Sequence, residues 1–430
     1  MDLSTDLIKL AELFAKKNSK LYVVGGAVRD YLLGYEYKDI DLAGSLPIEK
    51  VIKLCEKLNF KTKIINKNLG TLQIGKEQYE YTQFRIESYT NHKHSPDSVE
   101  FVEDITMDVA RRDITINSLY LDITENRIVD LCGGQKDLTK KIIRSTNQPE
   151  ITLKDDGLRI LRIIRFASLL NFKIEKKTYR ALKIFKANLK DIAKERILGE
   201  LNQIVVADLV HNNNNHNFLK LFNKLNLYPY IFNAELTRIK KISNRDIKAY
   251  YKLTKECRLI GLYFLILKNY FVGYNNIKQI SFICNSLLGL DGIKESGNSQ
   301  KIVEKLFLIY QNLCYNIDQV NASINYLSLS NAEREIVLKF LPKQAKNRLE
   351  KQILFIKEKN MPLGIHDLKI SSQDLIDAKI DNIYISKILN TLFNQVIESK
   401  VKNEKEDLLN LAKNIHETFK DINKRSKLWK

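Results

Sequence analysis

The sequence contains few of the residues that stabilise small secreted domains. Its 430 residues include five cysteines, six prolines and one tryptophan. The cysteines are odd in number and scattered, and no Cys-x-x-Cys or Cys/His cluster occurs. This pattern argues against a disulfide framework and against structural zinc. We therefore expect a soluble protein in a reducing setting, the cytoplasm.

Long apolar runs are also missing. No stretch approaches the roughly 20 apolar residues that a membrane-spanning helix needs. The first six residues carry two acids and lack the basic-then-apolar order of a signal peptide. Hydrophobic residues nevertheless make up 44% of the chain, which excludes a wholly disordered protein. We expect buried cores and no membrane partner.

Acidic residues are in deficit. The chain has 70 Lys and Arg against 51 Asp and Glu, which gives a formal net charge of +19. An excess of this size indicates a polyanionic partner such as nucleic acid. A general compositional bias toward lysine explains the charge equally well, so charge alone leaves the choice open.

Glycine becomes scarce after the first third of the chain. Eight of the 16 glycines lie before residue 135. The glycine-rich part alternates helical spacing, at residues 47–59, with short strand-like runs, at residues 21–24, 39–42, 78–85 and 98–102. Beyond about residue 138 the apolar residues recur at helical spacing. This predicts an α+β domain followed by mostly helical structure.

A glycine pair marks the first candidate site. Gly25 and Gly26 follow an apolar strand and precede a predicted helix at residues 28–33. A helix N-terminus behind a glycine turn binds phosphate through backbone N–H groups, and Arg29 adds a positive charge. For the glycine pair alone, an ordinary strand-to-helix turn is the simpler interpretation.

Two acids follow the turn. Asp39 and Asp41 point to the same face of a predicted strand, where two carboxylates repel each other unless a cation lies between them. Mg²⁺ is the natural cation beside nucleotide phosphates. Glu80, on another predicted strand, is a candidate third carboxylate. A solvated Asp-x-Asp turn is the alternative, but turn and acids together indicate nucleotidyl transfer.

Five segments in order resemble the motifs of class II tRNA nucleotidyltransferases and their bacterial poly(A) polymerase relatives. The first is the glycine turn with Asp39 and Asp41. The others are Arg-Arg-Asp-Ile-Thr-Ile-Asn-Ser-Leu at 111–119, Asp-Leu-Cys-Gly-Gly at 130–134 with an Asp-Leu pair at 137–138, Asp-Asp-Gly-Leu-Arg at 155–159, and Lys-Glu-Arg-Ile at 194–197 with a Glu-Leu pair at 200–201. Five motifs in order are far more specific than any one of them.

The resemblance implies a fold and a domain order. It implies a polymerase-β-like nucleotidyltransferase head at residues 1–140. An all-α neck at 141–210, a helical body at 211–340 and a tRNA-binding helical tail at 341–430 would follow. Oligomeric state stays open.

The resemblance also assigns roles. Asp39 and Asp41 would hold the metal ions, and Glu80 would join them as a catalytic carboxylate. The nucleotide-binding residues would be Gly25, Gly26, Arg29, Arg111, Arg112, Asp113, Asn117, Asp156, Arg159 and Arg162.

The fourth motif offers a way to select bases. Asp156 and Arg159 are three residues apart on a predicted helix. An aspartate accepts hydrogen bonds and an arginine donates several, which matches the Watson–Crick edge of cytosine or adenine. A surface ion pair is the alternative. We expect Asp155, where the family has Glu, to orient Arg159, and Arg165 to brace the neck.

The resemblance implies CCA addition to tRNA from CTP and ATP, with Mg²⁺ as cofactor. The polar segment at 85–101 matches a loop that the family uses to switch from CTP to ATP, which argues against CC-only addition. His92 and His94 in it fit a surface loop better than a metal site. Alternatives are a poly(A) polymerase, an A-adding enzyme, or an inactive RNA-binding protein that kept the fold. Residues 68–74 lack the basic stretch typical of poly(A) polymerases, which favours CCA addition.

Overall fold

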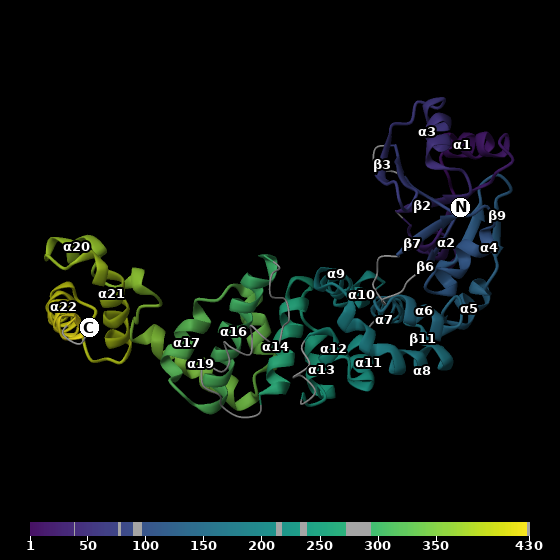
Figure 1. The fold of residues 1–430 in the computed structure, drawn as a ribbon. Helices are drawn as coiled ribbons and strands as arrows, with labels where there is room; N and C mark the ends of the chain where they lie inside the picture. The colour runs from purple at the N-terminus through teal and green to yellow at the C-terminus, as the bar shows by residue number, and fades with distance from the viewer. Residues whose placement is uncertain are drawn as a thin grey trace. The chain divides into compact units, whose positions relative to one another are not determined.

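The computed structural model describes residues 1–37, 39–75, 79–88, 97–211, 217–232, 239–271 and 294–427. Its described residues divide into two compact units, one up to residue 243 and one from residue 244 onwards (Figure 1). No helix in these ranges is long and apolar enough to cross a membrane. The predicted boundaries at 140, 210 and 340 stay a prediction.

The first unit begins with a seven-stranded mixed sheet in the order β3-β4-β5-β2-β1-β8-β9. Only the β2–β5 pair is parallel among these strands. The strands are β1 (Leu21–Val24), β2 (Ile40–Gly44), β3 (Thr62–Asn66), β4 (Thr71–Ile74), β5 (Tyr79–Gln83), β8 (Leu119–Asp122) and β9 (Arg127–Asp130). Short pairs form beside them, β6 (Arg85–Ser88) with β7 (Ser98–Phe101), and β10 (Ile142–Ile143) with β11 (Lys173–Ile174).

The central strand β1 is buried on both faces, which explains its unbroken apolar run. One face packs under α4 with Tyr22, Val24 and Tyr120 in a cluster of buried side chains. The head helices are α1 (Thr5–Ala15), α2 (Gly26–Leu33), α3 (Ile48–Glu56), α4 (Ile105–Ala110), η1 (Thr115–Asn117) and α5 (Gly134–Lys140). The predicted strands and helices of the head are therefore confirmed to within three residues at the ends that are described; the largest difference is at α3, which ends at Glu56 where the sequence predicts residue 59.

Helices complete the first unit. They are α6 (Pro149–Asp155), α7 (Arg159–Leu170), α8 (Lys176–Phe185), η2 (Lys186–Asp191), α9 (Lys194–Ile204), α10 (Ala207–Val210), α11 (Asn217–Leu225) and α12 (Tyr228–Ile231). The central helix α7 carries apolar residues on most of its surface and packs against α9, α10 and α11.

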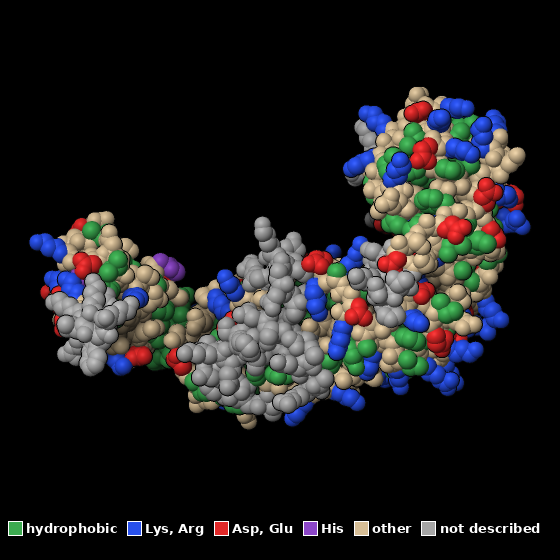
Figure 2. Space-filling model, in the orientation of Figure 1, with side chains coloured by type: hydrophobic (Ala, Val, Ile, Leu, Met, Phe, Trp, Pro, Cys, Tyr) green, Lys and Arg blue, Asp and Glu red, His purple; other side chains and the backbone are tan. Residues whose placement is uncertain are grey.

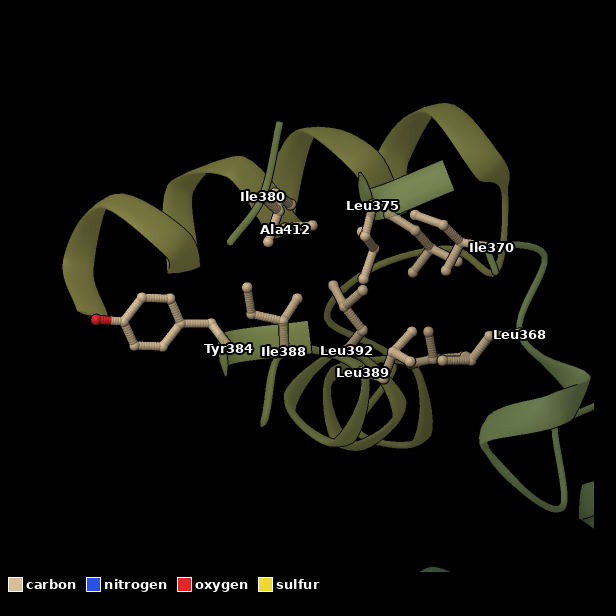
Figure 3. Packing of buried hydrophobic residues seen from close by; sticks show 11 residues of the cluster. Leu368, Ile370, Leu375, Ile380, Tyr384, Ile388, Leu389, Leu392 and Ala412 are labelled. Carbon is tan, nitrogen blue, oxygen red and sulfur yellow. The ribbon is translucent and has the colours of Figure 1, made fainter. Parts of the chain in front are cut away.

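The second unit is helical throughout its described residues, as the scarcity of glycine predicts. Its helices are α13 (Asn244–Tyr250), η4 (Lys255–Cys257), α14 (Arg258–Tyr270), α16 (Lys294–Tyr315), α17 (Gln319–Leu327), α18 (Asn331–Phe340), α19 (Lys343–Glu358), η5 (Ile365–Asp367), α20 (Ser372–Asp377), α21 (Asn382–Ile397) and α22 (Lys405–Lys427). At its end, Ile388 and Leu392 of α21 pack with Leu375 of α20 and Ala412 of α22 (Figure 3).

Candidate active site

The glycine pair forms the turn between β1 and α2. Gly25 has φ +82° and ψ −137°, a backbone conformation that residues with a side chain rarely adopt. A Cβ atom at this position would lie 3.7 Å from Oδ2 of Asp41. The turn therefore places backbone beside the candidate catalytic carboxylate, at the N-terminus of α2.

Strand register brings the acids together. Asp41 lies opposite Val24 of β1 on one side and opposite Glu80 of β5 on the other. Asp39 is two residues before Asp41, so both occupy the same face of the strand. Three elements thus place the turn, the aspartates and Glu80 in one row across the sheet, as the sequence predicts.

Asp41 lies in a site of excess negative charge. Its side chain is open to a cleft, yet reduced hydration there, together with the charges of Glu80 and Asp39, raises its pKa to about 6. The nearby guanidinium of Arg112 lowers the pKa only in part. A divalent cation would relieve this repulsion, and carboxylate oxygens are the hard donors that Mg²⁺ prefers. The residues present therefore fit a metal ion, although no group of three His, Cys, Asp or Glu in the described ranges has the arrangement of a complete metal cage.

A cleft of about 680 Å³ opens over these acids. Its walls include both glycines, both aspartates and Arg29. Arg29 is buried, donates two hydrogen bonds of 2.8 Å to Asp30 and a third of 2.6 Å to Asn117. The guanidinium and Asn117 are thus held in fixed positions at the edge of the cleft.

A second cleft, of about 940 Å³, adjoins the first. Arg112, Asp113 and Arg162 line both clefts. Arg162 donates from Nε to Asp113 at 2.8 Å, which ties the head to helix α7. Although burial alone would raise the pKa of Asp113, Arg162 holds it below its ordinary value. Both side chains are charged and partnered where the clefts meet.

Asp108 organises the second motif, and the sequence analysis missed it. Its fully buried carboxylate accepts hydrogen bonds from Arg111 at 2.8 Å, Arg112 at 3.0 Å and Tyr120 at 2.5 Å. Burial would raise its pKa, but Arg112 and Arg111 lower it to about 2. The signal was present, since Asp108 precedes the two arginines by three and four residues on a helical segment.

The fourth motif differs from its prediction. Asp156 and Arg159 do not share a helix, because α6 ends at Asp155 and α7 begins at Arg159. Asp156 has an extended backbone and accepts from Leu158 N–H at 2.8 Å, while its Oδ2 lies 3.9 Å from Nε of Arg159. Gly157 permits the break, because a Cβ there would lie 2.7 Å from the carbonyl oxygen of Asn188.

The pair is nevertheless together and nine-tenths buried, which excludes a surface ion pair. Arg159 donates to the carbonyl oxygens of Thr152, at 3.2 Å, and Arg111, at 2.7 Å. Asp156 and Arg159 line the larger cleft. The second and fourth motifs therefore meet in one wall, and Asp155, the last residue of α6, does not line either cleft.

The remaining motifs brace the site. Glu200 of α9 accepts from Arg165 at 2.9 Å and lies 3.6 Å from Arg162. Asp137 of α5 accepts from Thr115 at 2.8 Å and from Arg144 at 2.9 Å, which anchors the second motif. The predicted bracing contact of Arg165 is present. The predicted loop histidines His92 and His94 lie outside the described residues, as does most of the asparagine-rich segment at 211–217.

The comparisons with known proteins agree with this geometry. Residues 21–144 match the family model described as "Poly A polymerase head domain". Residues 171–236 match the one described as "Probable RNA and SrmB- binding site of polymerase A". A curated CCA-adding enzyme from Staphylococcus aureus (strain MRSA252) is 34% identical over 230 residues, which are 53% of this chain and 56% of that protein. The match thus spans little more than half the length of the curated relative.

Solved structures share the fold along most of the chain. The Bacillus stearothermophilus CCA-adding enzyme in complex with CTP has a TM-score of 0.63 at 21% identity, over 97% of this chain and 100% of that one. The Thermotoga maritima CCA-adding enzyme complexed with tRNA has a TM-score of 0.62 at 19% identity, over 96% of each chain. At these identities the likeness shows the fold.

Sheet, glycine turn and paired carboxylates give the start of the first unit the architecture expected of a nucleotidyltransferase head. The match of residues 21–144 to the poly(A) polymerase head-domain model agrees with the resemblance that the motifs indicate. The predicted fold, an α+β head followed by helices, is also confirmed.

Proposed function

We propose that this chain adds CCA to the 3′ end of tRNA, using CTP and ATP without a nucleic-acid template and releasing pyrophosphate. One observation carries the proposal: a cleft with two carboxylates adjoins a cleft with a buried Asp–Arg pair. The first arrangement suits phosphoryl chemistry, and the second suits recognition of a base. The curated relatives named as CCA-adding enzymes, and the solved ones with CTP, ATP and tRNA, support this choice.

The triphosphate would lie against the turn between β1 and α2. Backbone N–H groups of Gly25 and Gly26 face an anion without a side chain in the way, and the N-terminus of α2 favours negative charge. Arg112 contributes positive charge from the opposite wall, where Asp108 and Tyr120 hold it. Asn117, fixed by Arg29, offers its amide group to the sugar or the phosphates.

Asp39 and Asp41 would hold Mg²⁺, with Glu80 as the neighbouring carboxylate. When bound, the metal supplies charge neutralisation at the phosphates and lowers the pKa of the attacking 3′-hydroxyl. The carboxylates must be ionised to bind it, so the raised pKa of Asp41 makes metal binding release a proton below about pH 6.

Base selection would fall to Asp156 and Arg159. The Leu158 N–H fixes the carboxylate of Asp156, and two carbonyl oxygens fix the guanidinium of Arg159. The carboxylate can accept the amino proton of cytosine or adenine, and the guanidinium can donate to ring nitrogen and carbonyl acceptors. Guanine presents an N1–H donor where the guanidinium needs an acceptor, and uracil has no amino group at that edge.

The substrates also imply a location. tRNA, CTP and ATP meet in the cytoplasm, and the cysteines of the described residues, Cys55, Cys132, Cys257 and Cys314, are free. We infer a cytoplasmic enzyme.

Defined tRNA ends test the proposal. Three tRNA transcripts, which lack CCA, end in C or end in CC, are incubated with CTP and ATP, separately and together, in the presence of Mg²⁺. We expect growth to CCA and then arrest, with the first two additions requiring CTP and the last requiring ATP. Long A-tails on unrelated RNA without addition of C would instead indicate a poly(A) polymerase.

A variant pair locates the catalytic centre. Asp41→Ala should reduce incorporation by at least about 10³-fold, because the metal site loses a ligand. Asp6→Ala, on the exposed side of α1, is the matched control and should keep wild-type rates. Persistent incorporation by Asp41→Ala would disprove the assignment of this centre.

A further inference from the structure

An aromatic pair stands in the smaller cleft, apart from all five motifs. Tyr35 follows the end of α2, and His211 follows α10. Their rings are stacked with centroids 3.9 Å apart and an interplanar angle of 16°. Both line the cleft that contains Asp39 and Asp41. The stack therefore joins two distant segments beside the carboxylates.

The other aromatic residues of this cleft, within the described ranges, already pack against protein groups. The guanidinium groups of Arg165 and Arg29 lie over the ring of Phe166, with their central carbons 4.3 Å and 5.2 Å from the ring centroid. Tyr37 packs edge-on against Tyr31 and bonds through its hydroxyl group to the backbone of Asp2. Tyr35 keeps 36% of its surface exposed, so it presents ring surface to the cleft.

The electrostatics suit an uncharged stack. Burial against the protein lowers the pKa of His211 below its ordinary value, while Asp30 raises it and Arg29 lowers it. These two neighbours are paired with each other, so their charges nearly cancel. A neutral imidazole stacked on a phenol ring makes a flat surface that a nucleobase can extend.

The position of the Tyr35–His211 stack beside the carboxylates indicates which ligand it would contact. If the incoming nucleotide places its base against Asp156 and Arg159 in the larger cleft, its triphosphate reaches the carboxylates in the smaller one. The 3′-hydroxyl of the RNA must approach the same carboxylates from the remaining side. Tyr35 and His211 line the cleft that contains Asp39 and Asp41, and they take part in none of the five motifs that would hold the nucleotide.

We propose that Tyr35 and His211 form a stacking platform for the base of the terminal nucleotide of the RNA primer. The inference rests on the proposed function, because the primer is the RNA that is extended. Stacking on a ring tolerates every base. The platform can therefore hold the tRNA end before each of the three additions, although the terminal base changes.

A binding cycle tests the platform without catalysis. tRNA transcripts without CCA are prepared with an ordinary and with an abasic terminal nucleotide, and their Kd values are measured for wild type and Tyr35→Ala in the absence of nucleotide. With the ordinary end we expect Tyr35→Ala to raise Kd roughly tenfold, since loss of one base stack has about this effect. With the abasic end the two proteins should bind equally. Equal losses with both ends would overturn the proposal.

Kinetics with conservative variants supply the second readout. Tyr35→Ala should raise KM for the tRNA primer roughly tenfold and leave KM for CTP within about twofold of wild type. Tyr35→Phe should restore KM for the primer, and His211→Ala should raise it less than Tyr35→Ala does. Tyr315→Ala, an exposed tyrosine at the end of α16 that does not line the cleft, is the matched control. A rise in KM for CTP instead would contradict the platform.

The two proposals fail separately. If wild type adds no nucleotide to tRNA, the proposed function is wrong, whereas the binding cycle still reports on the platform. If wild type adds CCA and Tyr35→Ala binds both transcripts as wild type does, only the platform is wrong.

Discussion

Asp108 is an ionised carboxylate with no exposed surface, and burying such a charge costs free energy unless hydrogen-bond donors and positive charges surround it. Three donors compensate for its lost hydration: Arg111, Arg112 and Tyr120. Removal of its charge would leave Arg112 without this counter-charge and Arg111 with Glu87, 3.3 Å away, as its remaining acidic partner. The positions of Arg111 and Arg112 in the clefts thus depend on a residue that does not line either cleft.

We predict that Asp108→Asn lowers the free energy of unfolding of the first unit by about 3 kcal/mol near pH 7. The folded pKa of about 2 lies below the ordinary value of 3.8, so the ionised group stabilises the fold above pH 4. This contribution, roughly 2 kcal/mol, disappears as the pH falls through the folded pKa. Urea denaturation should show that the free energies of unfolding of wild type and variant differ by a constant amount from pH 7 to 4.5. This difference should become smaller below pH 4.

Asp6→Asn is the control for this titration, since its carboxylate is exposed on α1. If the difference in the free energy of unfolding between wild type and Asp108→Asn grew as the pH falls, the assignment of Asp108 as an ionised partner would be contradicted.

Arg159 gives a second prediction for a single side chain. Arg159→Lys keeps the charge but loses the planar fork of donors that two carbonyl oxygens hold in place. We expect kcat/KM for CTP and ATP to fall by about 10- to 100-fold and the relative use of UTP and GTP to rise. Single-nucleotide incorporation with each of the four nucleotides measures both effects.

Arg180→Lys is the matched control, because this arginine is exposed on α8. Unchanged selectivity in Arg159→Lys would move the reading of the base to other residues of the larger cleft.

Among the elements, the turn between β1 and α2 lends itself to a sharp comparison. Gly25 and Gly34 flank the same helix, and both have positive φ, +82° and +71°. Only Gly25 lies at the cleft, and a Cβ at Gly34 would meet nothing within 4 Å. Both glycines are therefore costly to substitute, but only Gly25 lies where the triphosphate is proposed to bind.

We predict that Gly34→Ala lowers the free energy of unfolding by about 1 to 2 kcal/mol, because alanine is strained in the left-handed helical region, and that Gly25→Ala lowers it by more, because its φ and ψ lie outside that region. Only Gly25→Ala should also raise KM for CTP and ATP, since it distorts the phosphate-binding turn. Thermal denaturation and steady-state kinetics separate the two effects. A similar KM increase in both variants would mean that α2 acts only through general stability.

For the whole molecule, the charge of +19 has a measurable consequence. Lys and Arg side chains are spread over the visible face of both units (Figure 2). If tRNA is the partner, as proposed, its binding to these side chains releases counterions, so the affinity falls steeply as salt increases. We expect log Kd to rise linearly with the logarithm of the salt concentration. The affinity for tRNA should fall by at least about tenfold between 50 and 200 mM salt. A flat profile would mean that the excess lysine reflects composition alone.

The sequence by itself determined the fold class and pointed to the residues that line the clefts. Spacing is local information: residues two apart on a strand share one face, and a glycine pair between a strand and a helix predicts a tight turn at the N-terminus of the helix. The strands β1 and β2, the glycine turn and the neighbouring aspartates follow from such short-range rules. The order of five motifs added the family, which no single motif could.

Tertiary structure alone decided which residues share a wall. The sequence predicts Asp156 and Arg159 as neighbours on one helix, but helix α6 ends before Asp156 and α7 begins at Arg159. The carbonyl oxygen of Arg111 then accepts a hydrogen bond that fixes Arg159. Asp108 reads as a plain helical acid until the sheet buries it under Tyr120. Tyr35 and His211 meet although 176 positions separate them in the numbering, 211 minus 35. Such contacts depend on how helices and sheet pack over long sequence distances, which local patterns do not encode.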